Sequence, residues 1–136
     1  MGKNKTKATV SSPGAYVAAI ADESRRRDCE GLMALMAKAS RYPAVMWGPS
    51  IVGFGVCRYP LAGGKQGEIC AVGFSSRKGD ISIYGVAGNS AAPALLQKLG
   101  THKLGKGCLY VSALADIDLR ILEKLVVQAV RARQAS

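Results

Sequence analysis

Glycines and basic side chains alternate in residues 100–107, which hold His102, Lys103 and Lys106 within five positions. The segment matches the first part of the phosphate-loop pattern, but Gly107 stands where that pattern needs a serine or threonine for the magnesium ion. It also follows a predicted helix and precedes a predicted strand, which is the reverse of a phosphate loop. We therefore expect no nucleotide-hydrolysing loop here, but a backbone that brings these three side chains close to an anionic ligand.

A second pair of basic residues, Arg77 and Lys78, lies in a predicted turn between two strands. A tight turn would project both side chains from one edge of the sheet, although basic residues in hairpin turns are usually only solvated. Residues 100–107 lead into another predicted strand and could reach the same edge. If the two segments meet, five basic side chains surround one hollow, which predicts a site for a small phosphate-containing anion.

Residues 46–55 join the only tryptophan, Trp47, to a proline turn and several glycines. Packing in the core is one interpretation of Trp47. The other is a place at the mouth of a pocket, with Ser50 as a hydroxyl donor. We predict the second, in which Trp47 and Ser50 form the rim of the ligand site.

Catalytic and metal-binding groups are sparse. His102 is the only histidine, and no carboxylate, serine or cysteine lies close in sequence to orient it. The four cysteines contain no C-x-x-C pair and no histidine beside them, so a zinc site is not expected. The opening of the chain does not resemble a secretory signal, which favours a cytoplasmic protein with reduced, mostly buried cysteines. We predict no catalytic residue, metal site or cofactor, and the sequence does not favour an enzyme.

The chain is basic throughout its middle. Its 136 residues include 19 Lys and Arg against nine Asp and Glu, a formal charge of +10, and residues 41–110 hold eight basic residues and two acids. This excess favours acidic partners. Arg25, Arg26 and Arg27 are interleaved with acids, so we expect a solvated, salt-bridged helix face there. No apolar run approaches the roughly 18 residues that cross a bilayer, so no membrane partner is expected.

The hydrophobic pattern predicts one domain over residues 13–136, behind a disordered basic tail of residues 1–12. The predicted elements are a helix over 13–20, a helix capped by Asp22 or Ser24, strands over 51–59, 68–75 and 80–86, a helix over 92–99, a strand over 107–111 and a helix over 116–133 capped by Asp116. Short glycine-containing turns between consecutive strands favour antiparallel pairing. We expect an α+β fold: a mainly antiparallel four-stranded sheet with helices packed on one face.

Four blocks of residues resemble the YdhG-like family (DUF1801) in the same order along the chain. They are residues 46–55, 73–78 with 83–84, 98–110 and 114–118, and the resemblance extends over about residues 16–130. It implies a small α+β domain of a mostly uncharacterised family, some of whose members have been described as frataxin-like iron chaperones. Two positions depart from the family pattern: Ser76 stands where proline is usual, and Leu104 where threonine is frequent. The second change removes a hydroxyl that could contact a ligand.

The function that these observations favour is binding of a small anion, with contacts from Arg77, Lys78, His102, Lys103, Lys106, Trp47 and Ser50. The alternative is binding of nucleic acid without sequence preference, through the same basic region and the lysines of the tail. An enzyme acting on a phosphorylated metabolite is less favoured, because paired carboxylates are missing. An iron chaperone is implied only by the resemblance, and it would need clustered surface carboxylates, whereas the acids around residue 25 alternate with arginines.

Overall fold

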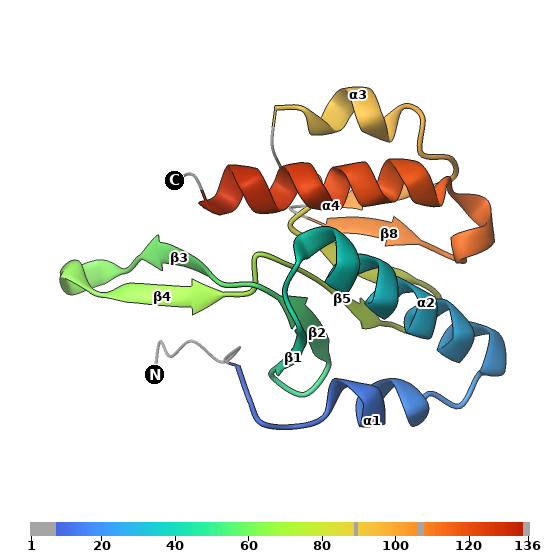
Figure 1. The fold of residues 1–136 in the computed structure, drawn as a ribbon, viewed down its shortest axis with the longest axis horizontal. Coiled ribbons are helices and arrows are strands. Elements are labelled where there is room, and N and C mark those ends of the chain that lie inside the picture. Colours follow the sequence, from blue (N-terminus) through green and yellow to red (C-terminus); the bar gives the residue numbers. More distant parts are fainter. Residues whose placement is uncertain (1–7, 89, 106–107, 135–136) are drawn as a thin grey trace.

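The computed structural model describes residues 8–88, 90–105 and 108–134 (Figure 1). The helices are α1 (Pro13–Ala18), α2 (Glu23–Ser40), α3 (Ala92–Leu96) and α4 (Leu119–Gln134). The strands are β1 (Ala44–Trp47), β2 (Ile51–Phe54), β3 (Cys57–Pro60), β4 (Gln66–Ile69), β5 (Val72–Ser76), β6 (Ile81–Tyr84), β7 (Lys103–Gly105) and β8 (Cys108–Val111). Short 3-10 turns occupy Ala62–Gly64 and Leu114–Asp116. The fold is α+β, as predicted.

The main sheet has six antiparallel strands in the order β1-β2-β5-β6-β8-β7, so the predicted count of four is wrong. Two predicted strands, 51–59 and 68–75, each divide in two, and their outer halves β3 and β4 form a separate two-stranded sheet. Gly55 explains the break, because its φ of 74° turns the chain out of the main sheet. The short strands β1 and β7, which the hydrophobic pattern did not mark, form the two edges.

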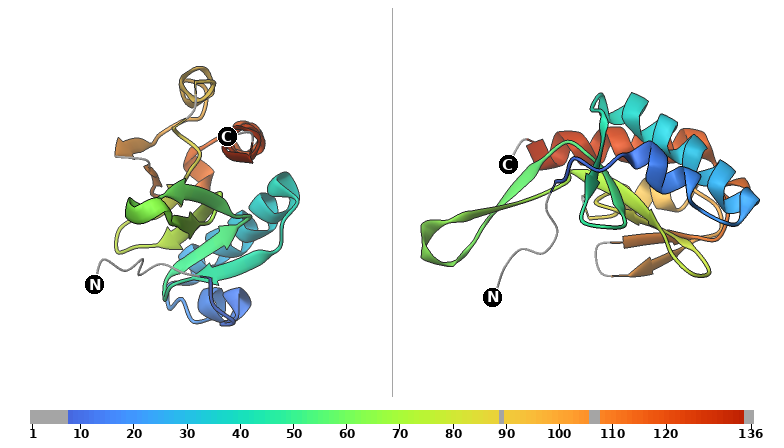
Figure 2. Two further views of the ribbon diagram at one scale, coloured as in Figure 1. Left: turned by 90° about the vertical axis from the view of Figure 1, so that its left-hand side faces the viewer. Right: turned by 90° about the horizontal axis from the view of Figure 1, so that it is seen from below.

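Helices cover one face of the main sheet, as predicted. Both views in Figure 2 show α2 and α4 on the same side of the strands, and α2 packs against β2, β5 and α4. The core between the layers is made of fully buried side chains, the largest of which include Phe54, Phe74, Ile81, Ile83 and Leu109 from strands and Leu32, Met36, Leu122 and Leu125 from helices. The opposite face of β5, β6, β8 and β7 has no described helix over it.

The N-terminal cap predicted from the sequence is confirmed for α2 and wrong for α4. Asp22 caps α2, since its Oδ1 accepts the amide N–H of Arg25 at 3.1 Å. The predicted cap of the last helix at Asp116 is wrong, because Asp118 Oδ1 accepts the amide N–H of Arg120 at 2.9 Å. The carbonyl of Asp116 instead accepts the N–H of Thr101 at 3.1 Å, and the next residue, Ile117, is extended, so α4 begins only at Leu119.

Part of the predicted tail, residues 1–12, is ordered against strand β1. Residues 1–7 lie outside the described residues, whereas the amide N–H of Thr9 donates to the carbonyl of Met46 at 2.8 Å and Ala8 pairs with Trp47. In the described part of the chain, no helix combines the length and the apolar composition that crossing a membrane requires.

Aromatic rings lie over glycines at several places on the strands. A Cβ atom built on Gly53 would lie 2.5 Å from Cδ1 of Trp47, and one on Gly105 would lie 2.7 Å from Cε2 of Tyr110. Tyr59 lies over Gly67 in the β3-β4 sheet in the same way. A strand glycine leaves room for a ring to lie against the backbone, so these glycines set the orientation of the rings.

The cysteines divide into two classes, and this predicts their reactivity. Cys29 and Cys70 are buried, and burial raises the pKa of the Cys29 thiol to about 11. Cys57 and Cys108 are half-buried. Because the thiolate is the reacting form, we expect two of the four thiols to react promptly with a disulfide reagent at pH 8, and all four in denaturant. Prompt reaction of all four thiols in the folded protein would contradict the burial of Cys29 and Cys70.

Candidate functional site

The three predicted ligand-binding segments lie at one end of the main sheet. Residues 48–50 connect β1 to β2 there, residues 77–80 connect β5 to β6, and β7 begins there. Strand pairing puts Ser75, Ser82, Tyr110 and Lys103 in one row across β5, β6, β8 and β7. Three strand spacings separate Ser75 from Lys103, about 14 Å in all. The segments share an end of the sheet but lie side by side across its width.

A cavity of about 500 Å³ lies at this end, between the α1-α2 connection and the β5-β6 turn. Its lining residues are Tyr16, Ala19, Ile20, Asp22, Arg25, Ser76, Arg77, Lys78 and Gly79. Three of them are cationic, and the one carboxylate, Asp22, is already engaged as the cap of α2. The cavity therefore combines an excess of positive charge with a size typical of sites for small ligands.

Arg25 reaches from α2 to the β5-β6 turn and holds it in place. Its Nη1 donates to the carbonyl oxygens of Arg77 (2.7 Å) and Asp80 (3.0 Å) and to Oγ of Ser76 (3.3 Å). The hydroxyl of Tyr16, on α1, accepts the amide N–H of Ser76 at 3.1 Å. The turn that carries Arg77 and Lys78 is therefore fixed by both N-terminal helices.

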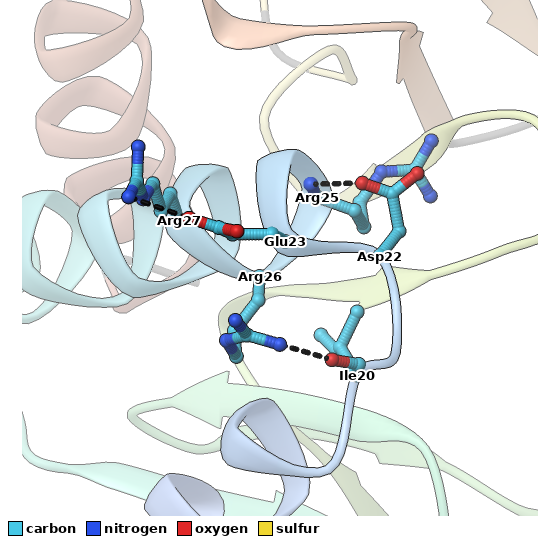
Figure 3. A network of polar contacts seen from close by, with 6 residues as sticks. All are labelled: Ile20, Asp22, Glu23, Arg25, Arg26 and Arg27. Atoms are coloured by element: carbon cyan, nitrogen blue, oxygen red, sulfur yellow. Dashed lines mark hydrogen bonds and ion pairs between the residues drawn. The ribbon is translucent and has the colours of Figure 1, made fainter.

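The arginine triplet of α2 does not behave as one unit (Figure 3). Arg27 pairs with Glu23 at 2.6 Å with both side chains exposed, which confirms the predicted solvated face for this residue. Arg26 donates to the carbonyl of Ile20 at 2.8 Å and closes the α1-α2 connection. For Arg25 the prediction is wrong, because this side chain lines the cavity.

A sequence signal for Arg25 does exist. The buried stripe of α2 runs through Cys29, Leu32 and Met36, and Arg25 lies one turn before Cys29 on the same stripe. A cationic side chain in that position lies at the end of the core, where its charged group contacts the element that packs against the helix. The four-residue spacing from Cys29 therefore distinguishes Arg25, on the buried stripe, from Arg26 and Arg27, which lie off it.

Arg77 lies back over the open face of the sheet. Its Nε donates to Oγ of Ser75 (3.2 Å) and its Nη2 to the hydroxyl of Tyr84 (3.0 Å), and the Ser75 and Tyr84 hydroxyls are 2.9 Å apart. The hydrogen bond to Tyr84 raises the pKa of Arg77, so the group stays cationic at every accessible pH. Two hydroxyls thus position the Arg77 side chain, which stays exposed at the surface.

A second cavity, of about 370 Å³, lies on this open face. It is lined by Arg77, Asp80, Ser82, Tyr84, Cys108 and Tyr110. The side chain of Cys108 hydrogen-bonds the hydroxyl of Tyr110 and raises the pKa of this phenol. Arg77 lines both cavities, whereas the first has the other two cations and the second has two phenol rings.

Trp47 and Ser50 do not form the predicted rim. Trp47 is 3% exposed, because its ring lies over Gly53 inside the sheet, so its placement at a pocket mouth is wrong. Ser50 is half-buried in the β1-β2 turn. Neither residue lines either cavity described above.

The basic residues of the 100–107 segment also lie apart from both cavities. The Nδ1 of His102 is 2.8 Å from the carbonyl oxygen of Gly100; because a carbonyl only accepts, Nδ1 carries a proton. Lys103 is exposed on the edge strand β7. Lys106 lies outside the described residues. The predicted convergence of these residues with Arg77 and Lys78 around one hollow is therefore wrong for His102 and Lys103.

Searches of family models, curated proteins and solved structures find no match to this chain. The resemblance to the YdhG-like family stays a prediction. Within residues 8–88, 90–105 and 108–134, no three histidine, cysteine or acidic residues gather where they could hold a metal ion. The geometry described above is therefore the basis for assigning a function.

Proposed function

We propose that this protein binds a small phosphate-containing anion in the 500 Å³ cavity, through Arg25, Arg77 and Lys78. The observation that carries the proposal is the arrangement of these cations around one hollow with a single, already engaged carboxylate. Guanidinium groups suit phosphate oxygens because their donors form a planar fork.

Preorganisation supports the same conclusion. Nη1 of Arg25 is held by three acceptors on the β5-β6 turn, so little side-chain freedom remains to be lost when a ligand binds. In the described part of the chain, its Nε and Nη2 donate to no protein acceptor. These atoms are the donors that we assign to the anion.

Titration of inorganic phosphate and pyrophosphate, followed by thermal unfolding, tests the proposal. Both should raise the unfolding temperature above that in chloride of equal ionic strength, since a ligand that binds only the folded state stabilises it. The Lys78→Gln variant should bind pyrophosphate about tenfold more weakly, a loss of about 1.4 kcal/mol. Lys65→Gln is the matched control, because Lys65 is also an exposed turn lysine but lies in the β3-β4 hairpin.

Two results of this titration would contradict the proposal. If neither anion shifts the unfolding temperature, or if Lys78→Gln and Lys65→Gln weaken binding equally, the cavity is not the binding site. Equal effects would mean that any surface lysine contributes through the net charge of the protein alone.

A further inference from the structure

The open face of the main sheet carries features that a small-anion site does not use. Across β5, β6, β8 and β7, one row of this face holds Ser75, Ser82, Tyr110 and Lys103. The next row holds Gly73, Tyr84, Cys108 and Gly105. The helices α2 and α4 pack on the other side of these strands (Figure 2). Ser75 and Ser82 are buried, so the surface of this face presents two half-buried phenol rings and an exposed lysine at its edge.

Both rings on this face are held in fixed orientations. Tyr110 lies over Gly105 of the neighbouring strand, so one side of its ring rests on the backbone. The hydroxyl of Tyr84 is held between Ser75 (2.9 Å) and Arg77 (3.0 Å). The two tyrosines occupy diagonal positions on the adjacent strands β6 and β8, and the Tyr84 side chain leans toward β5 whereas the Tyr110 ring leans toward β7. Two ordered aromatic surfaces on one face suit unstacked bases of a single strand.

Charge on the same face favours a polyanion. Arg77 and Lys103 lie on either side of the two tyrosines, at β5 and at the edge strand β7, and both are exposed. Asp80 is the one acid lining the cavity between the rings. The whole chain has a formal charge of +10, so a second copy of it would be repelled from this face, whereas a chain of phosphates would be attracted.

We propose that this face binds single-stranded nucleic acid without sequence preference, with bases stacked on Tyr84 and Tyr110 and phosphates against Arg77 and Lys103. This goes beyond the small-anion site: the two share only Arg77, and neither tyrosine lines the first cavity. Stacking requires bases that are not paired, so a duplex of the same length should bind more weakly. Binding should also weaken as salt rises, because counterions are released from the phosphates.

Fluorescence anisotropy with a labelled oligothymidine of about 12 nucleotides tests the proposal, since site sizes on comparable surfaces are about 4–16 nucleotides. Tyr110→Leu should weaken binding about tenfold, because it removes a stacking ring, whereas Tyr110→Phe keeps the ring and should bind like the wild type. Tyr59→Leu is the matched control: Tyr59 also lies over a strand glycine, but in the β3-β4 sheet away from the face. Lys103→Gln should flatten the dependence of log K on log salt by about 0.7.

Several outcomes would overturn the proposal. They are an absence of oligothymidine binding at low salt, equal binding of a duplex, or equal affinities for Tyr110→Leu and Tyr59→Leu with both variants folded by circular dichroism. Self-association that Tyr110→Leu abolishes, without any oligonucleotide binding, would assign the face to a second copy instead. Lys78→Gln with phosphate tests the small-anion site separately, because neither Lys78 nor Arg25 lies in the two rows of this face.

Discussion

Replacing Gly85 by alanine should lower the free energy of unfolding by about 3 kcal/mol and the unfolding temperature by about 10 °C. Gly85 follows β6 with a φ of 87°, and a Cβ atom there would collide with the carbonyl oxygen of Ala71. The left-handed conformation costs a side chain about 1 kcal/mol, and the collision adds to it because a backbone atom cannot rotate away. Ala71 is fully buried and leads directly into β5, so the displacement would reach the centre of the sheet.

Gly63→Ala separates the two parts of this cost. Gly63 also has a positive φ, 78°, but nothing lies within 4 Å of a Cβ atom built on it. It should lose only the conformational part, about 1 kcal/mol. Denaturant unfolding of both variants gives the difference. Equal losses for Gly85→Ala and Gly63→Ala would mean that the contact with Ala71 is relieved at no cost, contrary to this expectation.

Gly53→Ala should expose Trp47, shift its fluorescence to the red and lower the free energy of unfolding by about 2 kcal/mol. A Cβ atom on Gly53 would lie 2.5 Å from Cδ1 of Trp47 and 2.5 Å from Cβ of Cys70, so the indole ring must leave its place. Trp47 is the only tryptophan of the chain, so its emission reports this position alone.

Gly31→Ala is the control for this variant. Gly31 lies inside α2, and the nearest atom to a Cβ built on it is Cδ1 of Leu114 at 3.9 Å, an ordinary contact. Alanine is the better helix former, so this variant should be more stable by about 0.5–1 kcal/mol with unchanged fluorescence. An emission maximum in Gly53→Ala identical to that of the wild type would show that the ring does not depend on the glycine.

Local signals in the sequence located most of the elements. The start of α1 at Pro13 was predicted, and Asp22 was one of the two predicted caps of α2, because both signals depend on residues within a few positions of one another. The strands were found as hydrophobic runs, but the break at Gly55 was missed. A glycine inside a run is compatible with a strand, a bulge or an exit from the sheet, and only the packing partners decide among these.

The candidate site was predicted less completely. The turn with Arg77 and Lys78 was correctly predicted between two strands, but the Arg77 side chain lies back over the sheet instead of projecting from its edge. The residue that joins these two at the cavity is Arg25 and not the 100–107 segment. Strand order explains the difference. The pairing β5-β6-β8-β7 places two strands between Arg77 and Lys103, and the order of strands depends on packing across the whole domain.

The amino-acid sequence by itself determined the basic charge, the start of α1 at Pro13 and most of the hydrophobic runs that become strands. These properties depend on composition and short-range spacing, which any conformation of the chain retains. Tertiary structure alone decided that Arg25 meets the β5-β6 turn and that Tyr84 and Tyr110 lie on neighbouring strands. Those contacts join residues far apart in the chain, and they form only when burial of the shared core offsets the entropy of bringing such segments together.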